Sequence, residues 1–485
     1  KGKVDELAAH QKRWGELMNE VATIYANLLA VRTSSARVVS AGRIRTAMGD
    51  TIMTVADLEN MTEDQLELFA NVLHLTDGPA DAMRIMKRGW IGKAFGVNLE
   101  YWMNSILSGP GTHALNVAST AAKTMLIPGE KAVGGVLGGD PRAVREGLMT
   151  YYYMVSSFSD AMRAASKAFM TDRPQLSATH ALLRRRAQIS GESLGISPEW
   201  PILANLIDYA GSRIRLPFRL LTAEDELFKH ITYSSVVKAR AYQAGLDKGL
   251  VGPDLAQYVR KIHDDAFDMA GRGLDPYAVG EAAEGTFQRT LPPGGFANSY
   301  LRMAYEHPAL RQATPFVRTP TNLFSDSVQR SPLWFLSKRL WGDLRSPNDS
   351  VRASARGRLA TAQALSVLAG WLAWTGRFTG SAPGNKAQRE AWGMSGKRPH
   401  SLVFGLDGPE EDRQYVRLQM DPFTPVISII TDFVNMSGEM DDATLDEYAT
   451  AIVSSIAENL TSKVYLRGLS DFLGAAMKPD RDLKH

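Results

Sequence analysis

Long stretches rich in Ala, Leu, Arg and Met, separated by Pro and Gly, constrain this 485-residue chain more than any other sequence feature. These residues favour helices, whereas Pro and Gly end them. Alternating strand patterns occur only around His400–Phe404 and Gln414–Met420, with Asp407-Gly408-Pro409 between them. The sequence therefore predicts an all-α fold, an extended multi-helix body with at most one small β-hairpin near residues 400–420.

Several helices can be placed from their periodicity and their end signals. Thr62 and Gln65 form a capping box at the start of a helix predicted over 63–73. Gly109-Pro110-Gly111 predicts a turn between two helices, and the pairs Gly134-Gly135 and Gly138-Gly139 predict a hinge. A long amphipathic helix that docks on other helices is predicted by apolar residues at steps of three and four, namely Val4, Leu7, Trp14, Met18, Val21, Tyr25 and Leu28, with the polar Gln11 in the same series.

The chain is expected to be an internal fragment of a longer protein, because it begins at Lys1 without an initiator Met or a signal sequence. We divide it into an N-terminal helical region (1–100), a second helical region (101–300) and a region (301–485) that contains the uncharged helix and the hairpin. Hydrophobic residues make up 44% and charged residues 22%, which is typical of folded proteins. The absence of Cys excludes disulfides and thiolate metal sites.

Charge is unevenly distributed, although the formal net charge is only +3. Arg311–Arg358 contains nine Arg or Lys and three Asp, whereas Asp432–Glu447 contains six acids and no base. The two stretches can pair with each other, the basic one can face phosphate, or both can form a solvated and balanced surface.

Two uncharged stretches raise the question of membrane contact. Leu359–Gly376 has 18 uncharged residues, the lower limit for a spanning helix, but its Ala, Thr, Gln and Ser content favours a buried core helix. Ser105–Ala122, which carries no charge unless His113 is protonated, is rich in small residues and predicts close helix packing after a turn.

No catalytic motif is present, and the chain is not expected to be an enzyme or to bind a cofactor or metal. P-loop, dinucleotide-binding, zinc-protease and nucleophile-elbow patterns are all missing from the sequence. The carboxylate pairs Glu224 with Asp225 and Glu281 with Glu284 are interpreted as acids near helix starts, where they favour the helix dipole. A single His such as His230 is interpreted as a packing residue.

Several segments, in order, resemble the very large virion-associated proteins of tailed bacteriophages. These are internal virion or DNA-ejection proteins, often called large polyvalent proteins. The segments are 104–116 (NSILSGPGTHALN), 223–229 (AEDELFK) followed by Tyr233, the triplet 286–288 (TFQ), 315–322 (PFVRTPTN) followed by 330–332 (RSP), and a last pattern from Thr379-Gly380 through 399–401 (PHS) to Asp421-Pro422. The resemblance covers roughly residues 100 to 435, and residues 381–382 and 393–396 depart from it.

The resemblance implies a structural protein carried inside the virion and ejected with the genome, where it helps form a conduit for DNA across the host cell envelope. The implied partners are other copies in a homo-oligomer, other internal, portal or tail proteins, double-stranded DNA bound without sequence preference, and the host inner membrane. The implied location is the virion interior, and the host periplasm or inner membrane after ejection. The alternatives are a peptidoglycan-cleaving or other enzymatic domain of such a protein, a membrane-inserting module, or a DNA-packing core protein.

The candidate interaction residues lie in the resembling segments, except for Arg339, which lies in the basic stretch Arg311–Arg358. Arg318 is interpreted as a phosphate contact or a cap for helix carbonyls, and Asn322 as the cap of a helix over 323–330. The full set is Asn104, Thr112, His113, Asn116, Arg318, Asn322, Arg330 and Arg339.

Overall fold

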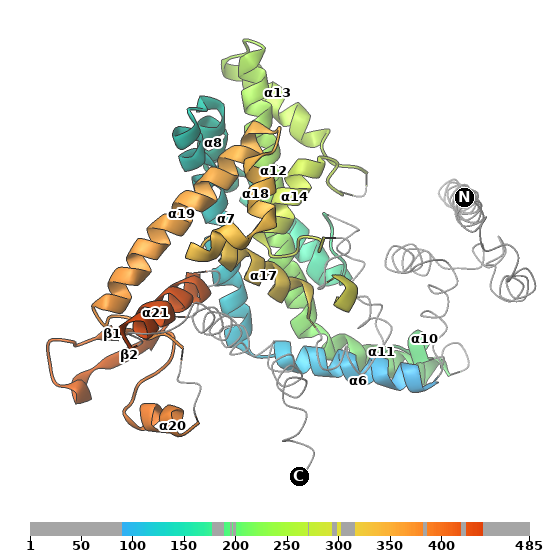
Figure 1. Ribbon diagram of the computed structural model, residues 1–485. Coiled ribbons are helices and arrows are strands. Elements are labelled where there is room, and N and C mark those ends of the chain that lie inside the picture. Colours follow the sequence, from blue (N-terminus) through green and yellow to red (C-terminus); the bar gives the residue numbers. More distant parts are fainter. Residues whose placement is uncertain are drawn as a thin grey trace, which may run out of the picture. The chain divides into compact units, whose positions relative to one another are not determined.

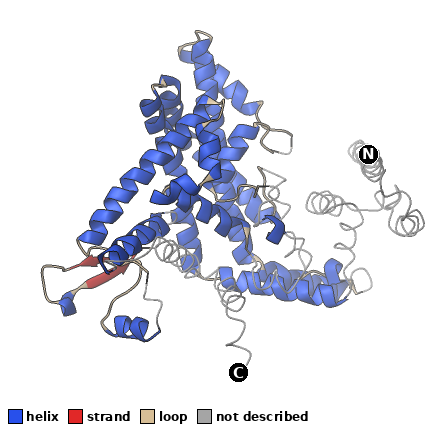
Figure 2. Cartoon of the chain, in the orientation of Figure 1, coloured by secondary structure: helices blue, strands red, loops and turns tan. Residues whose placement is uncertain are grey.

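The computed structural model describes residues 90–176, 189–194, 196, 200–269, 271–292, 298–301, 316–381, 386–418 and 423–439. In these ranges the chain forms α-helices and one two-stranded antiparallel sheet (Figures 1 and 2). The predicted all-α class with one small hairpin is confirmed. The helices predicted over 4–28 and 63–73 lie outside the described residues.

Most of the helices are long. The elements run, in chain order, α6 (Trp90–Leu107), α7 (Pro110–Gly138), α8 (Pro141–Thr171), α10 (Gly191–Leu194), α11 (Pro201–Ile214), α12 (Leu216–Asp247), α13 (Gly252–Asp264), α14 (Pro276–Gly285), α17 (Arg318–Gln329), α18 (Lys338–Leu344), α19 (Asp349–Trp374), α20 (Lys386–Met394), β1 (Ser401–Phe404), β2 (Gln414–Arg417) and α21 (Phe423–Glu439), with 3₁₀ turns at Pro332–Leu336 and Glu410–Asp412.

Residue contacts divide the chain into two units. The first contains the described residues 90–98 and 189–211, and within it the amide of Gly191 donates to Asp208 Oδ1 at 2.9 Å. The second contains residues 99–176 and the described residues from 212 onward. The sequence-based divisions at residues 100 and 300 remain predictions.

Two apolar clusters hold α12 at the centre of its neighbours. On one side Phe228 and Ile231 of α12 pack against Met154 and Ala161 of α8. On another, Tyr233 belongs to a cluster that reaches α14. Burying an apolar side chain of this size contributes roughly 1.5–3 kcal/mol, so these contacts fix α12 between α8 and α14.

Helices α7 and α19 approach so closely that their backbones touch. A Cβ atom at Gly134 of α7 would overlap the carbonyl oxygen of Ala353, and one at Gly357 of α19 would overlap the carbonyl oxygen of Glu130. The predicted hinge at Gly134-Gly135 is therefore wrong, because these glycines lie inside α7 and serve helix packing. Of the four glycines in the two predicted hinge pairs, Gly139 alone has a left-handed backbone (φ +65°), and it ends α7.

Aspartates at helix starts explain why several helices begin where they do. Asp140, which precedes Pro141, accepts hydrogen bonds from the amides of Arg142 and Ala143 at the start of α8. Asp275 caps α14 in the same way. Proline in the first turn is tolerated because its missing amide would have no helical partner there. The predicted turn at 109–111 is also confirmed, since α6 ends at Leu107 and α7 begins at Pro110.

The uncharged stretch 359–376 falls in α19 and has two different faces. Ala362 and Ala369 are fully buried, whereas Val367 and Trp374 are exposed. The expectation of a buried core helix is thus wrong for the second face. Among the residues that the structure describes, no helix is long and apolar enough to cross a membrane.

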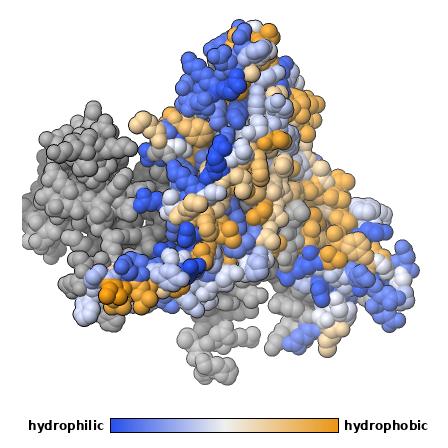
Figure 3. Space-filling view, turned by 180° about the vertical axis from the view of Figure 1, so that it is seen from behind, coloured by the Kyte–Doolittle hydropathy of each residue, from blue (hydrophilic) through white to orange (hydrophobic). Residues whose placement is uncertain are grey.

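The predicted hairpin is present, and it lies beside the end of α19. Ser401 pairs with Arg417 and Phe404 with Gln414, and a bridge from Phe378 to Leu402 ties the sheet to the segment after α19. Behind it, Phe378 packs against Ala369 and against Val426, Ile427 and Ile430 of α21. Figure 3 shows that hydrophobic residues also remain on the molecular surface seen from behind.

Candidate functional site

Residues from the first and second resembling segments meet between α7 and α12. His113 Nδ1 lies 2.7 Å from Glu224 Oε1, and Asn116 Nδ2 donates to Glu224 Oε2 at 2.9 Å. Burial raises the pKa of the Glu224 carboxyl, while the hydrogen bonds from Asn116 and His113 oppose that rise. The first segment is therefore bonded to an acid more than a hundred residues further along the chain.

The second segment in turn contacts the third. Gln288 donates to Asp225, and its oxygen accepts from Lys229 Nζ at 2.9 Å. Lys229 also lies 3.4 Å from Glu226, which is fully buried. Burial alone would raise the pKa of Glu226, but Lys229 and His230 lower it below its usual value. The cluster therefore keeps a buried carboxylate charged.

The third segment contacts the fourth through Asn322. The Asn322 amide donates to the carbonyl oxygens of Phe287 at 3.0 Å and Arg289 at 2.7 Å. Phe287 adopts a positive φ of 55°, which is rare for a bulky residue, and its ring lies 3.9 Å from Lys123 Nζ. Asn322 thus holds an unusual bend after α14 rather than a helix end.

These contacts join the first four resembling segments in sequence, each to the next. We call the set of side chains that makes them the motif network: His113, Asn116, Glu224, Asp225, Lys229, Gln288 and Asn322.

A set of buried ion pairs lies beside the motif network. Arg330 is 1% exposed and binds Glu130 of α7 with two hydrogen bonds, of 2.8 and 2.6 Å, and Asp326 at 2.5 Å. Asp326 also pairs with Lys123 at 2.9 Å. Burial alone would lower the pKa of Arg330, but Asp326 and Glu130 raise it. A planar guanidinium with this geometry locks α17 onto α7.

Further ion pairs connect α14 with α18, and α18 with α19. Glu284 binds Arg339 at 2.5 Å and lies 3.6 Å from Lys123. Arg358 of α19 binds Asp343 at 2.6 Å. Although burial would raise it, the pKa of Glu284 falls to about 2, because Lys123 and several Arg side chains surround it.

A further group contains more acid than base. Lys131 binds Glu146 at 3.0 Å and the Tyr277 hydroxyl at 2.8 Å, and lies 3.9 Å from Glu281. Burial would lower the pKa of Lys131, but Tyr277, Glu146 and Glu281 raise it. Burial raises the pKa of Glu281. Ser350 of α19 bonds to Glu146.

We call the buried ion pairs and hydrogen bonds of the last three paragraphs together the ion-pair network. Its members are Lys123, Glu130, Lys131, Glu146, Tyr277, Glu281, Glu284, Asp326, Arg330, Arg339, Asp343, Ser350 and Arg358.

The last resembling segment forms a separate polar cluster under the hairpin. His400, whose φ is +55°, lies with Nδ1 2.8 Å from the Ser428 hydroxyl. Thr379 donates to the carbonyl oxygen of Arg398 at 2.6 Å, and the Ser381 hydroxyl donates to Asp432 at 2.7 Å. The His400 contact ties the start of the hairpin to α21, and the Ser381 bond ties the segment after α19 to the same helix.

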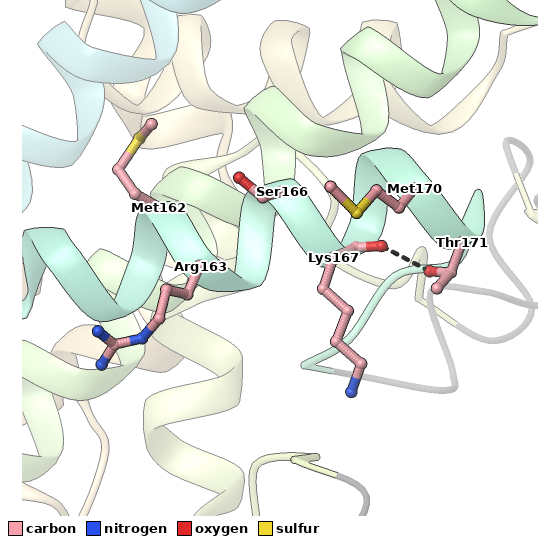
Figure 4. A pocket seen from close by; sticks show the side chains of 6 residues that line it. All are labelled: Met162, Arg163, Ser166, Lys167, Met170 and Thr171. Atoms are coloured by element: carbon pink, nitrogen blue, oxygen red, sulfur yellow. Dashed lines mark hydrogen bonds between the residues drawn. The ribbon is translucent and has the colours of Figure 1, made fainter.

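The side chains of the motif network and of the ion-pair network join helices to one another. The carboxylates of the ion-pair network lie within ion-pair distance of Lys or Arg side chains; Glu281 is the most distant of them, at 3.9 Å from Lys131, and burial raises its pKa. In the described ranges no three His, Asp or Glu side chains are arranged to hold a metal ion. A hollow on α8 is lined by other residues, and the six that form it are Met162, Arg163, Ser166, Lys167, Met170 and Thr171 (Figure 4).

Three sequence-based interpretations are wrong. Asn322 does not cap a helix, because α17 already begins at Arg318 and includes it. The basic stretch is not simply a solvated or phosphate-facing surface, because Arg330 and Arg358 are buried among acids. Glu224 and Glu284 are not in the first turns of α12 and α14, so the helix dipole does not explain them.

The other predicted residues have diverse roles. Asn104 bridges α6 and α12, since its amide donates to the carbonyl of Glu100 and its oxygen accepts from the Phe218 amide at 3.2 Å. Thr112 lies in the first turn of α7, where its amide donates to the Gly109 carbonyl oxygen. Arg318 is half-buried at the start of α17, and Arg339 belongs to the ion-pair network. The eight candidates are therefore not gathered into one site.

The α7 side of the ion-pair network is not among the residues predicted from the sequence. Lys123, Glu130 and Lys131 stand almost alone in a helix of apolar and small residues, and all three are buried. Isolated charges in such a helix are the available signal, because a buried charge requires a partner. Their partners cannot be deduced from spacing, since Glu130 and Arg330 are 200 residues apart.

Comparison with known proteins provides no relative. No protein-family model, no curated protein and no solved structure matches this chain.

Proposed function

We propose that this chain is a non-enzymatic structural protein of a tailed-bacteriophage virion that leaves with the genome and helps form a conduit for DNA across the host envelope. It would act as a homo-oligomer beside other internal, portal or tail proteins. Double-stranded DNA, bound without sequence preference, would be its cargo, and the host periplasm or inner membrane its destination.

The contact of each of the first four resembling segments with the next is the observation that carries this proposal. In an enzyme, shared motifs converge on a cleft where substrate is bound. Here the shared residues bond to one another across helices, as His113 and Asn116 do with Glu224. Side chains that bond to one another across helices hold those helices together, which supports a structural role for the motif network.

The ion-pair network is also suited to a protein that must fold more than once. A chain that passes through a narrow tail travels at least partly unfolded, and a Cys-free chain can do so without reducing a disulfide. Its helices can then form locally. Buried ion pairs add little net stability, but they penalise wrong pairings because each mispaired charge stays buried and unmatched.

The proposal can be tested by counting the chain in purified phage particles before and after DNA release. Particles would be emptied in vitro, separated from released protein and compared by quantitative mass spectrometry, with the major capsid protein as the retained standard. We expect the chain to be present in full particles and depleted in emptied ones. Equal amounts in both, or absence from full particles, would refute the proposal.

A further inference from the structure

The outer face of α8 carries a row of large apolar side chains. Leu148, Tyr152, Val155, Met162 and Met170 recur at helical spacing, and Val155 and Met170 are 81% and 75% exposed. The opposite face of α8 is buried against α12. Single exposed apolar residues are ordinary, but a row along one helix indicates an interaction surface.

A hollow in this face has the layout that receives a side chain of another helix. Its walls include Arg163, Ser166, Lys167 and Met170, at positions i, i+3, i+4 and i+7 (Figure 4). When two helices pack, a side chain of one inserts between four residues of the other with this kind of spacing. Ser166, the smallest of the four, leaves room between Met162 and Met170. The hollow therefore favours a helix as the occupant.

The charges along the same face indicate the chemistry of that helix. Arg145, Arg163 and Lys167 lie beside the apolar row, against the single acid Asp160, which pairs with Arg163. Arg145 donates to the neutral Gln243, and neither it nor Lys167 forms an ion pair with any described residue. A second copy using the same face would oppose base to base, which is unfavourable. An acidic edge on the partner is complementary.

We propose that the outer face of α8 is the docking surface for an amphipathic helix of another protein, which places apolar residues on the row and acidic residues beside Arg163 and Lys167. This goes beyond the proposed function, because it rests on α8 alone and holds for any assembly in which the chain takes part.

The test uses the full chain and two synthetic helical peptides of about three heptads. Both carry Leu at the core positions; one carries Glu at the flanking positions and its twin carries Lys. Binding is measured by fluorescence anisotropy. We expect the Glu peptide to bind at least about tenfold more tightly than its twin, and less tightly as salt is added.

Variants separate this surface from general stickiness. Val155→Glu combined with Met162→Glu should abolish binding, and Arg163→Glu combined with Lys167→Glu should reverse the preference to the Lys peptide. Val251→Glu is the matched control, since Val251 is 71% exposed outside α8 and its change should leave binding intact. Circular dichroism establishes that each variant is folded.

Three outcomes would overturn the proposal. They are the absence of binding by either peptide, equal binding of both, and binding that survives Val155→Glu with Met162→Glu. Capture of the chain by phosphatidylglycerol vesicles, lost in that same variant while no peptide binds, would also overturn it and assign the face to lipid.

Discussion

Replacing Arg330 by Met removes the guanidinium at the centre of the ion-pair network while keeping most of its volume. Arg330 makes three charged hydrogen bonds, two to Glu130 and one to Asp326. Asp326 retains Lys123 at 2.9 Å, whereas Glu130 keeps no other ion pair among the described residues. Leaving a buried charge unmatched costs about 3–5 kcal/mol, so we expect Arg330→Met to lower the free energy of unfolding by that amount.

The assay is urea unfolding followed by circular dichroism at neutral pH. Arg163→Met is the matched control, because the Arg163 side chain is 77% exposed and its pair with Asp160 lies on the surface; the expected change is within about 0.5 kcal/mol. Adding Glu130→Gln to Arg330→Met should recover at least about 1.5 kcal/mol, since it removes the unmatched charge. A loss below about 1 kcal/mol in Arg330→Met, or no recovery in the double variant, would refute this account of the network.

Three further predictions concern other contacts. Glu284→Gln should lower the free energy of unfolding by about 3 kcal/mol at pH 7. This loss should shrink as pH falls from 4.5 toward 2, because the Glu284 carboxyl, with its lowered pKa, stabilises the fold only while it is ionised. A loss in urea unfolding that does not change with pH would contradict this. Gly357→Leu should destabilise the fold by about 3 kcal/mol or more, because the new side chain overlaps the Glu130 carbonyl. Gly342→Ala, with open space around it, should change stability by less than about 1 kcal/mol. Equal changes of melting temperature in the two variants would contradict the close packing of α7 on α19. Asn322→Ala should cost about 1–3 kcal/mol by leaving two carbonyls unmatched, which differential scanning calorimetry would detect, and an unchanged melting temperature would count against the bend it holds.

Features that depend on nearby residues could be predicted from the sequence. Proline and glycine at 109–111 correctly separated α6 from α7, and the alternating residues around Asp407-Gly408-Pro409 correctly gave the hairpin. Both signals act within a few residues, where backbone geometry decides the outcome.

Features that depend on distant partners could not be predicted. Gly134 suggested a hinge because glycine is common in turns, but its role is set by Ala353 on another helix. Asn322 suggested a cap because Asn is favoured at helix starts, yet α17 already begins at Arg318, with Pro320 in its first turn, where proline is accepted. The acids Glu281 and Glu284 were recognised as a pair, but their basic partners come from α7 and α18.

Location of the chain by cryo-electron microscopy, in intact particles and in emptied particles attached to host envelopes, tests the central claim most directly. The account predicts helical density for this chain inside the intact capsid or near the portal. After DNA release, that density should be gone from the particle and present in the envelope below the tail. Density that stays fixed in the capsid or tail in both states would contradict the proposal that this protein leaves with the genome.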